Sequence, residues 1–158
     1  MLMVKKDYQA MPRNEKKVAK AIAKNQPVST KYAIELCREI RMKRLSSVES
    51  RLQRIMQKQE FLPLRQYNKK VAHRKGNSVS GVKSGRFPVR LCSVFLKLLE
   101  SVKANADFKG LDSENLVITH CFASRGFARR SIQPKGHIAG KRRRSKSTHI
   151  EVIVAEAK

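Results

Sequence analysis

The spacing of apolar residues along the chain predicts three helices. Each of three segments repeats its apolar residues every three or four positions, which gives the segment one face suited to burial. These segments are residues 29–42, 46–59 and 88–109. Ser29 is a candidate N-cap of the first helix, and the sequence SSVE from Ser46 to Glu49 has the form of a capping box at the start of the second. Pro88 suits the first turn of the third helix, which Gly110 ends.

Two later segments predict β-strands. Residues 116–122 and 150–155 are rich in β-branched residues and have the length of ordinary strands. Antiparallel pairing about a centre near Gly136 predicts the register Ile118 to Val154, His120 to Val152 and Phe122 to Ile150. One side of this pair is nearly all apolar, so we expect it to pack on the helices. His120 is then expected to be a hydrogen-bonded residue of the core.

Three other regions lack a clear pattern. Residues 123–149, between the two strands, have no core pattern; as a two-stranded arm of about 13 residues per side they would project roughly 45 Å, at ~3.3 Å per residue. Residues 61–86 contain three glycines and little periodicity, so they are predicted to form an irregular basic segment. Residues 18–25 are ambiguous: their three alanines favour a helix by propensity, whereas Val18 and Ile22 alternate with Lys20 and Lys24 as in a strand. The pattern alone favours a helix.

The charge of the chain points to a polyanionic partner. Its 158 residues include 36 Lys+Arg against 12 Asp+Glu, which gives a formal net charge of +24. Residues 61–99 and 115–150 each contain nine basic residues and no acidic residue, so these two windows carry +18 of that charge. A cation that neutralises a phosphate of a nucleic acid releases counterions, which favours binding, whereas a carboxylate between the cations would repel the phosphate. Both acid-free windows are therefore predicted to lie against phosphates.

A run of cations stands directly before the second predicted strand. Residues 141–146 include five cations, and a run of this kind alone is usually a solvated face or a tail. Here the run lies in the arm of a predicted hairpin whose base is core. We interpret the distal arm as cationic because polyanion surrounds it, where it buries nothing apolar.

Several other classes of protein find no support in the sequence. The longest apolar runs are four residues, far below the roughly 20 that cross a bilayer. Lysines at positions 5 and 6 follow the first four residues, which leaves no apolar region of secretory type. Cys37, Cys92 and Cys121 are isolated and odd in number, so they predict small buried residues in a reducing compartment rather than a disulfide framework or a zinc site.

Two alternatives involving nucleic acid are also disfavoured. A metal-dependent nuclease or an rRNA-modifying enzyme requires clustered carboxylates beside the phosphate, and the acidic residues lie outside both basic windows. A DNA-binding module requires a cationic recognition helix, whereas the most cationic parts here are loops and a hairpin. The sequence therefore predicts no enzyme, no metal, no cofactor, no small-molecule substrate and no membrane partner.

Four stretches of the chain resemble a known family. They are VSTKYAIELCREIRMKRL at residues 28–45, LPLRQYNKKVAHRKG at 62–76, ESVKANADFKGLDSENLVI at 100–118 and STHIEVIVAE at 147–156. Together they resemble the universal large-subunit ribosomal protein called L twenty-two in bacteria and L seventeen in eukaryotes, from about residue 18 to residue 157. Residues 62–76, followed by GRFP at 85–88, resemble the insertion typical of archaeal and eukaryotic members.

This resemblance implies both a fold and a place in the cell. The implied fold class is α+β, with three helices packed on a small antiparallel three-stranded sheet and a long protruding β-hairpin. One domain would span residues 18–158, with the irregular basic insertion at 61–86 and the extended hairpin at 123–149, after a basic N-terminal extension at 1–17. Residues 18–25 would be the third strand. The implied location is the large ribosomal subunit in the cytoplasm, after nuclear passage in a eukaryote.

The resemblance also implies the partners and the tunnel contact. The partners are large-subunit rRNA, neighbouring large-subunit ribosomal proteins and the nascent polypeptide, because the hairpin of the family lines the nascent-peptide exit tunnel. The tunnel-lining tip would consist of Pro134, Lys135, Gly136, His137, Ile138, Ala139 and Gly140. This tip departs from the family pattern P-R-A-x-G-R-A, since Lys135 and Ala139 stand at its two arginine positions.

The expected rRNA-binding residues are the cations of the two windows and one histidine. In the insertion they are Arg65, Lys69, Lys70, His73, Arg74, Lys75, Lys83 and Arg86. In the hairpin they are Arg125, Arg129, Arg130, Lys135, Lys141, Arg142, Arg143, Arg144 and Lys146. Tyr67, Phe108 and Phe127 are candidates for stacking on bases, although 6% aromatic residues do not make a stacking platform of the RRM type. A solvated histidine remains an equal alternative for His73, and His149 is predicted to be a structural polar residue.

Overall fold

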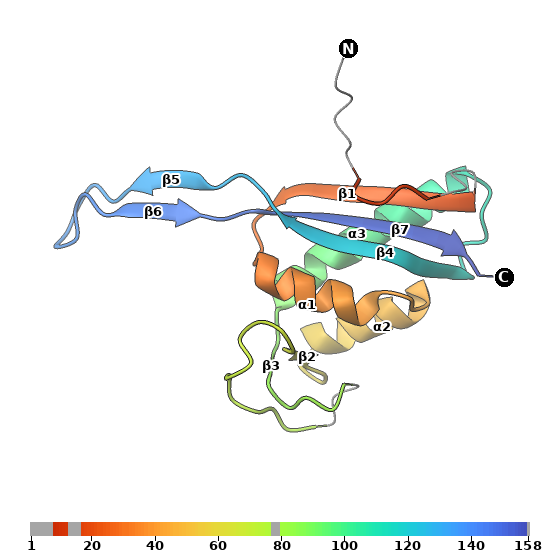
Figure 1. The fold of residues 1–158 in the computed structure, drawn as a ribbon, viewed down its shortest axis with the longest axis horizontal. Helices are drawn as coiled ribbons and strands as arrows, with labels where there is room; N and C mark the ends of the chain where they lie inside the picture. The colour runs from red at the N-terminus through yellow and green to blue at the C-terminus, as the bar shows by residue number, and fades with distance from the viewer. Residues whose placement is uncertain (1–7, 13–16, 77–79, 158) are drawn as a thin grey trace, which may run out of the picture.

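The computed structural model describes residues 8–12, 17–76 and 80–157. Its elements in chain order are β1 (Val18–Gln26), α1 (Thr30–Ile40), α2 (Leu45–Met56), β2 (Leu62–Pro63), β3 (Gly85–Arg86), α3 (Val89–Phe108), β4 (Leu116–Arg125), β5 (Arg129–Ile132), β6 (Arg142–Ser145) and β7 (Thr148–Glu156). β1, β7 and β4 form an antiparallel sheet in that order (Figure 1). β5 and β6 pair as an arm beyond the end of this sheet. The predicted α+β fold with three helices and a protruding hairpin is confirmed.

The hydrophobic core lies between the three helices and one face of the sheet. α3 packs against β1 and α2, while α1 packs against β4. Phe95 of α3, Leu36 of α1, Leu52 of α2 and Val152 of β7 are buried together in this layer. The apolar faces predicted for the three helices therefore meet in one core. None of the helices in the described ranges is both long and apolar enough to span a bilayer.

The helix boundaries follow the predicted signals only in part. Ser29 occupies the N-cap position of α1 as predicted, although its side chain makes no capping hydrogen bond. α2 begins at Leu45, so the capping box predicted at Ser46 is wrong and Arg44 is the N-cap residue. The backbone of Arg44 pairs with β4 and Leu45 is buried, and these two contacts start the helix earlier than the local motif suggests. Gly110, with a φ of 70°, follows the end of α3 as predicted.

Residues 18–26 form strand β1, which confirms the expectation from family resemblance against the helix favoured by the pattern alone. Ala19 and Ala21 pair with residues of β7 and are buried on the helix-covered face. Lys20, between them, lies on the outer side of the sheet, as strand alternation requires. Pairing with a buried neighbour strand outweighs the helix propensity of alanine here.

The predicted register of β4 and β7 is correct at the first pair and wrong beyond it. The observed pairs are Ile118 to Val154, His120 to Ile153 and Phe122 to Glu151. β4 has an irregularity at Thr119, and the added residue moves the following side chains to the opposite face. Cys121 and Ala123 are therefore buried, whereas Phe122 is 38% exposed. The prediction that His120 and Phe122 belong to the core is wrong.

Candidate nucleic-acid interface

The arm is held by backbone pairing and glycine turns. β5 and β6 pair over four residues each, and all eight residues are exposed. At the tip, Gly136 and Gly140 have φ values of 91° and 80°, which glycine adopts without strain. The Gly140 N–H donates to the carbonyl O of Gln133 at 2.9 Å and closes the turn. All seven residues predicted for the tip, 134–140, are exposed.

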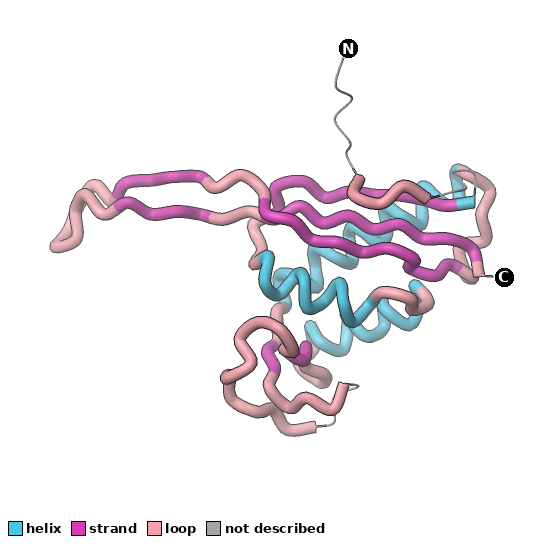
Figure 2. Tube along the Cα trace, viewed as in Figure 1, coloured by secondary structure: helices cyan, strands magenta, loops and turns pink. Residues whose placement is uncertain are grey.

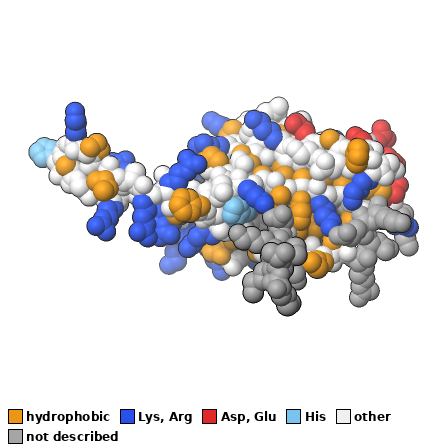
Figure 3. Space-filling model, turned by 90° about the horizontal axis from the view of Figure 1, so that it is seen from above, with side chains coloured by type: hydrophobic (Ala, Val, Ile, Leu, Met, Phe, Trp, Pro, Cys, Tyr) orange, Lys and Arg blue, Asp and Glu red, His pale blue; other side chains and the backbone are white. Residues whose placement is uncertain are grey.

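The cations of the hairpin lie on the surface of this arm and of its base. All nine predicted residues are exposed, namely Arg125, Arg129, Arg130, Lys135, Lys141, Arg142, Arg143, Arg144 and Lys146. Figure 3 shows Lys and Arg side chains along the arm and acidic side chains at the opposite end of the molecule. The register places Arg130 directly opposite Arg144. Like charges opposite each other weaken a strand pair, so a polyanion that neutralises both would stabilise the arm.

A buried carboxylate fixes the beginning of the basic insertion on α1. Glu35 is 1% exposed and accepts three backbone N–H groups, from Arg65 at 3.2 Å, Gln66 at 2.7 Å and Tyr67 at 2.6 Å. Phe61 and Leu64, just before this point, are buried, so the first residues of the predicted irregular segment belong to the core. The insertion therefore leaves the domain from a fixed start, and most of it is loop (Figure 2).

A network of ion pairs supports the same region. The carboxylate of Glu39 on α1 lies 3.1 Å from the guanidinium of Arg51 on α2 and 3.0 Å from that of Arg65. Arg51 also donates to Glu60 at 2.6 Å, and Arg54 pairs with Glu60 at 3.2 Å. Glu39 and Arg51 are both buried, and removing one partner would leave an uncompensated buried charge. The network ties α1, α2 and the insertion together.

The eight residues predicted in the insertion divide into two groups. Six are exposed, namely Arg65, Lys69, Lys70, His73, Lys75 and Lys83. Arg74 and Arg86 are half-buried, and each donates to the carbonyl O of Gly85, at 3.3 and 3.2 Å. The guanidinium of Arg74 also lies 5.4 Å from the ring centroid of Phe87. Arg74 and Arg86 thus help to shape the loop that presents the other cations.

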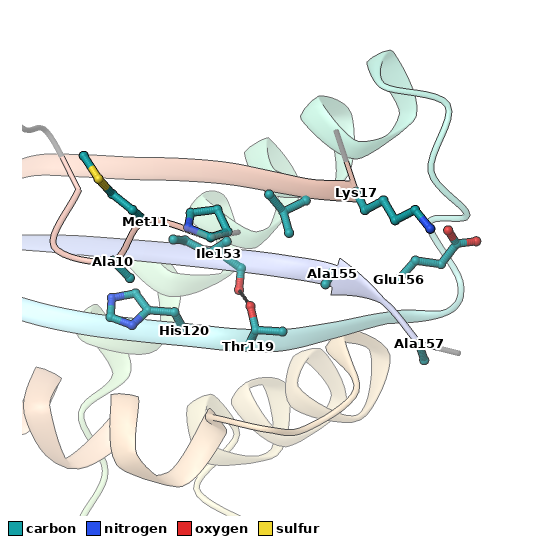
Figure 4. Close-up of a pocket in the computed structure, with 11 residues that line it drawn as sticks. Ala10, Met11, Lys17, Thr119, His120, Ile153, Ala155, Glu156 and Ala157 are labelled. Carbon is teal, nitrogen blue, oxygen red and sulfur yellow. Dashed lines mark hydrogen bonds between the residues drawn. The ribbon is translucent and has the colours of Figure 1, made fainter. Parts of the chain in front are cut away.

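The outer face of the sheet carries a separate polar contact and a groove. His120 Nε2 lies 2.9 Å from Glu151 Oε1, and the N–H of Gln9 donates to the same carboxylate at 3.1 Å. Beside them is a cavity of about 570 Å³, with Met11 on one side and Ile153 on its floor (Figure 4). Residues 8–12 of the predicted N-terminal extension lie against the sheet, whereas residues 1–7 and 13–16 lie outside the described residues.

Acidic side chains elsewhere serve the local structure. Asp112 accepts hydrogen bonds from the backbone N–H of Glu114 and the side chain of Asn115, and these bonds hold the pKa of the Asp112 carboxyl below its usual value.

His149 accepts the N–H of Asn25 through Nδ1 at 3.0 Å, in agreement with its prediction as a structural residue. Among the described residues, no group of three or more His, Cys, Asp or Glu side chains is placed to hold a metal ion.

Sequence reasoning missed the residues that position the two cationic surfaces. Glu35 and Glu39 have the spacing of ordinary acidic residues on an exposed helix face, and only the position of the insertion makes them buried anchors. Asn25 has a φ of 53°, and its side chain accepts the N–H of Phe127 at the point where the arm leaves the sheet. Asparagine tolerates this backbone conformation better than most residues, which is the one local signal that the sequence offered.

The fold and these surfaces define a class: a small α+β protein with a cationic hairpin arm and a basic insertion anchored on a helix. The sequence profile of the family described as Ribosomal protein L22p/L17e matches residues 21–155. The chain therefore belongs to this family of ribosomal proteins.

Curated relatives match nearly the whole chain. The protein named large ribosomal subunit protein uL22 of Ignicoccus hospitalis is 39% identical over 145 residues, which are 91% of each chain. The protein of the same name from Methanosphaera stadtmanae is 35% identical over 98% of this chain and 100% of its own length. That of Archaeoglobus fulgidus is 35% identical over 97% of each chain. These archaeal matches agree with the archaeal or eukaryotic type that the insertion indicated.

Proposed function

We propose that the chain is a structural component of the large ribosomal subunit and binds large-subunit rRNA. The names of its relatives support this assembly. The observation that carries rRNA binding is the arm at residues 129–146, in which both strands are exposed, the cations have no carboxylate among them and two arginines stand opposite each other. Such an arm gains stability from a polyanion around it.

The two cationic surfaces give the protein two separate attachments to RNA. The arm extends from one end of the sheet, and the insertion lies beyond α1 and α2 on the side away from the sheet (Figure 1). Affinity comes from neutralised phosphates, and specificity comes from the fit of these shapes to folded RNA. In this role the protein contributes charge and shape and performs no reaction. Two attachments far apart in the molecule suit a protein that holds two rRNA elements together.

The tip of the arm is assigned to the wall of the nascent-peptide exit tunnel, where it contacts the nascent polypeptide. Family resemblance supports this assignment, and so does the form of the arm, which is only two strands wide and ends in seven exposed residues. Neighbouring large-subunit proteins complete its surroundings, and the location is that of cytoplasmic ribosomes. Lys135 supplies the one cation within the tip.

Sucrose-gradient sedimentation tests the assembly and the role of the arm. The tagged full-length chain is expressed in cells and should remain with large subunits at about 0.5 M salt, because many phosphate contacts act together. The test variant replaces Arg142, Arg143 and Arg144 by Gln. The control variant removes the same charge from exposed residues outside both windows, Lys31, Arg44 and Lys58. We expect the arm variant to dissociate at lower salt than the control variant.

Two results would overturn the proposal in different ways. A wild-type chain that sediments apart from large subunits at low salt would contradict assembly. Equal salt resistance of the arm variant and the control variant would contradict binding of rRNA by the arm.

A further inference from the structure

The neck, defined here as residues 126–128 and 146–147, joins the arm to the sheet and is asymmetric. Arg125 pairs with Thr148 at the end of the sheet, and Arg129 pairs with Ser145 at the start of the arm. Three residues connect these pairs on one side and two on the other. The longer side, with one extra residue as in a β-bulge, contains Phe127, whose side chain is 72% exposed.

Close hydrogen bonds hold the neck in this conformation. Oδ1 of Asn25 accepts the N–H of Phe127 at 3.1 Å, and the N–H of Gly126 donates to the carbonyl O of Ser147 at 2.9 Å. The hydroxyl of Ser147 lies 2.5 Å from the carbonyl O of Phe127. A Cβ on Gly126 would lie 2.5 Å from Ser147 Oγ and 2.8 Å from Asn25 Oδ1, so a side chain at this position would displace the two groups that hold the neck. The exposed ring of Phe127 therefore projects from a fixed backbone.

The ring of Phe127 borders a cavity that combines apolar and cationic walls. The cavity has a volume of about 310 Å³. Pro27 and Phe127 supply apolar surface, and Arg129 and Lys146 supply positive charge. Neither cation forms an ion pair with any residue that the structure describes. An aromatic face beside two cations fits a ligand with one flat apolar part and one anionic part.

We propose that the neck binds a single unpaired nucleotide of the rRNA, with its base stacked on Phe127 and its phosphate held by Arg129 and Lys146. Proteins recognise RNA outside its helices by stacking splayed bases on aromatic side chains, and the neighbouring cations supply the contact to the backbone. An apolar side chain from a neighbouring protein would fill only the apolar part and leave the two cations without an anion, whereas one nucleotide supplies both a flat ring and a phosphate. This inference rests on the proposed binding of rRNA and assigns one contact within it.

Filter binding of the full-length chain to deproteinised large-subunit rRNA measures the contact. Phe127→Ala should lower the affinity about fivefold to 150-fold, as expected for the loss of one stacked base. Phe127→Tyr keeps an aromatic face and should retain affinity near that of the wild type. Phe122→Ala is the matched control, because the Phe122 ring is 38% exposed on the sheet and stacks on His120, outside the neck and the arm. Its affinity should equal that of the wild type.

The dependence on salt separates stacking from charge. Phe127→Ala removes no cation, so the slope of log affinity against log salt should stay the same. Replacement of Arg129 and Lys146 by Gln should reduce that slope by about 0.7 for each phosphate of single-stranded RNA that is no longer neutralised. Unchanged affinity of Phe127→Ala, with wild-type binding intact, would overturn the nucleotide site and leave rRNA binding in place. Failure of the wild type itself to bind would contradict the proposed function.

Crosslinking within assembled subunits identifies the class of partner. A photoreactive benzoylphenylalanine at position 127 should give one RNase-sensitive crosslink, mapped to a single rRNA nucleotide. An RNase-resistant crosslink to another protein would overturn the proposal and make the neck a protein contact. Absence of any crosslink from subunits that contain the variant would overturn it as well.

Discussion

Replacement of Glu35 should release the basic insertion from the domain. Its carboxylate accepts three backbone N–H groups from residues 65–67 and is almost completely buried. A hydrogen bond to a charged group contributes about 1.5–3 kcal/mol, but the three share one acceptor and are not additive. After detachment the freed amides regain water, because Arg65 and Gln66 lie at the surface. We therefore expect Glu35→Ala to lower the free energy that holds residues 65–67 in place by about 2–4 kcal/mol.

Hydrogen exchange of the free protein measures this loss at the affected amides. A loss of about 2 kcal/mol corresponds to exchange roughly 30-fold faster at Arg65, Gln66 and Tyr67. Glu35→Gln should be intermediate, because it retains one carbonyl acceptor and places an NH₂ group near the remaining N–H donors. Glu49→Gln is the control, since it breaks only the partly exposed pair with Lys103 and should cost less than about 1 kcal/mol.

The anchoring role of Glu35 is contradicted if the amides of residues 65–67 exchange at the wild-type rate in Glu35→Ala. It is also contradicted if Glu49→Gln accelerates them equally, because the effect would then be a general loss of stability. Either result would mean that the insertion is attached by its apolar residues and not by the buried carboxylate.

Three further predictions concern the sheet, the tip and the thiols. Ile150→Ala, in the core, should lower the free energy of unfolding by about 2–5 kcal/mol in urea titration, whereas Phe122→Ala, on the outer face, should cost under about 1 kcal/mol; equal losses would contradict the observed register. Deletion of residues 135–140 should leave entry into large subunits intact and change the output of a stalling-peptide reporter; failed assembly with unaltered stalling would make the tip an assembly anchor. Burial raises the pKa of the Cys92 thiol to about 12, so stability should fall as pH rises from about 9 to 12, where the unfolded chain ionises this thiol first. Cys92→Ser should reduce this loss of stability at alkaline pH, measured by unfolding at a series of pH values. A loss as large as in the wild type would mean that other groups cause it.

Periodicity predicted the helices because burial of one face leaves a regular trace in the sequence. The same reasoning failed for β1, where small alanines fit both a helix and the inner face of a strand, and only pairing with β7 decides between them. It also failed at Thr119, because one added residue turns the following side chains of β4 to the opposite face of the sheet. The amino-acid composition does not reveal such a residue. Long-range pairing sets both outcomes.

The candidate site was predictable where charge alone defines it. The exposure of the cations in the arm follows from a segment with no apolar pattern, and the structure agrees. The inward contacts of Arg74 and Arg86 were not predictable, since their partner is the carbonyl of Gly85, which the loop brings close. Nor was the fixed neck at Phe127, because its support comes from Asn25, distant in sequence.

A density map of large ribosomal subunits from cells in which this chain is the sole copy would show directly whether the arm reaches the tunnel. We expect the arm at residues 129–146 to run through rRNA and the exposed tip at 134–140 to form part of the wall of the nascent-peptide exit tunnel. Subunits that lack the chain, or an arm that lies on the outer surface away from the tunnel, would contradict the proposed function.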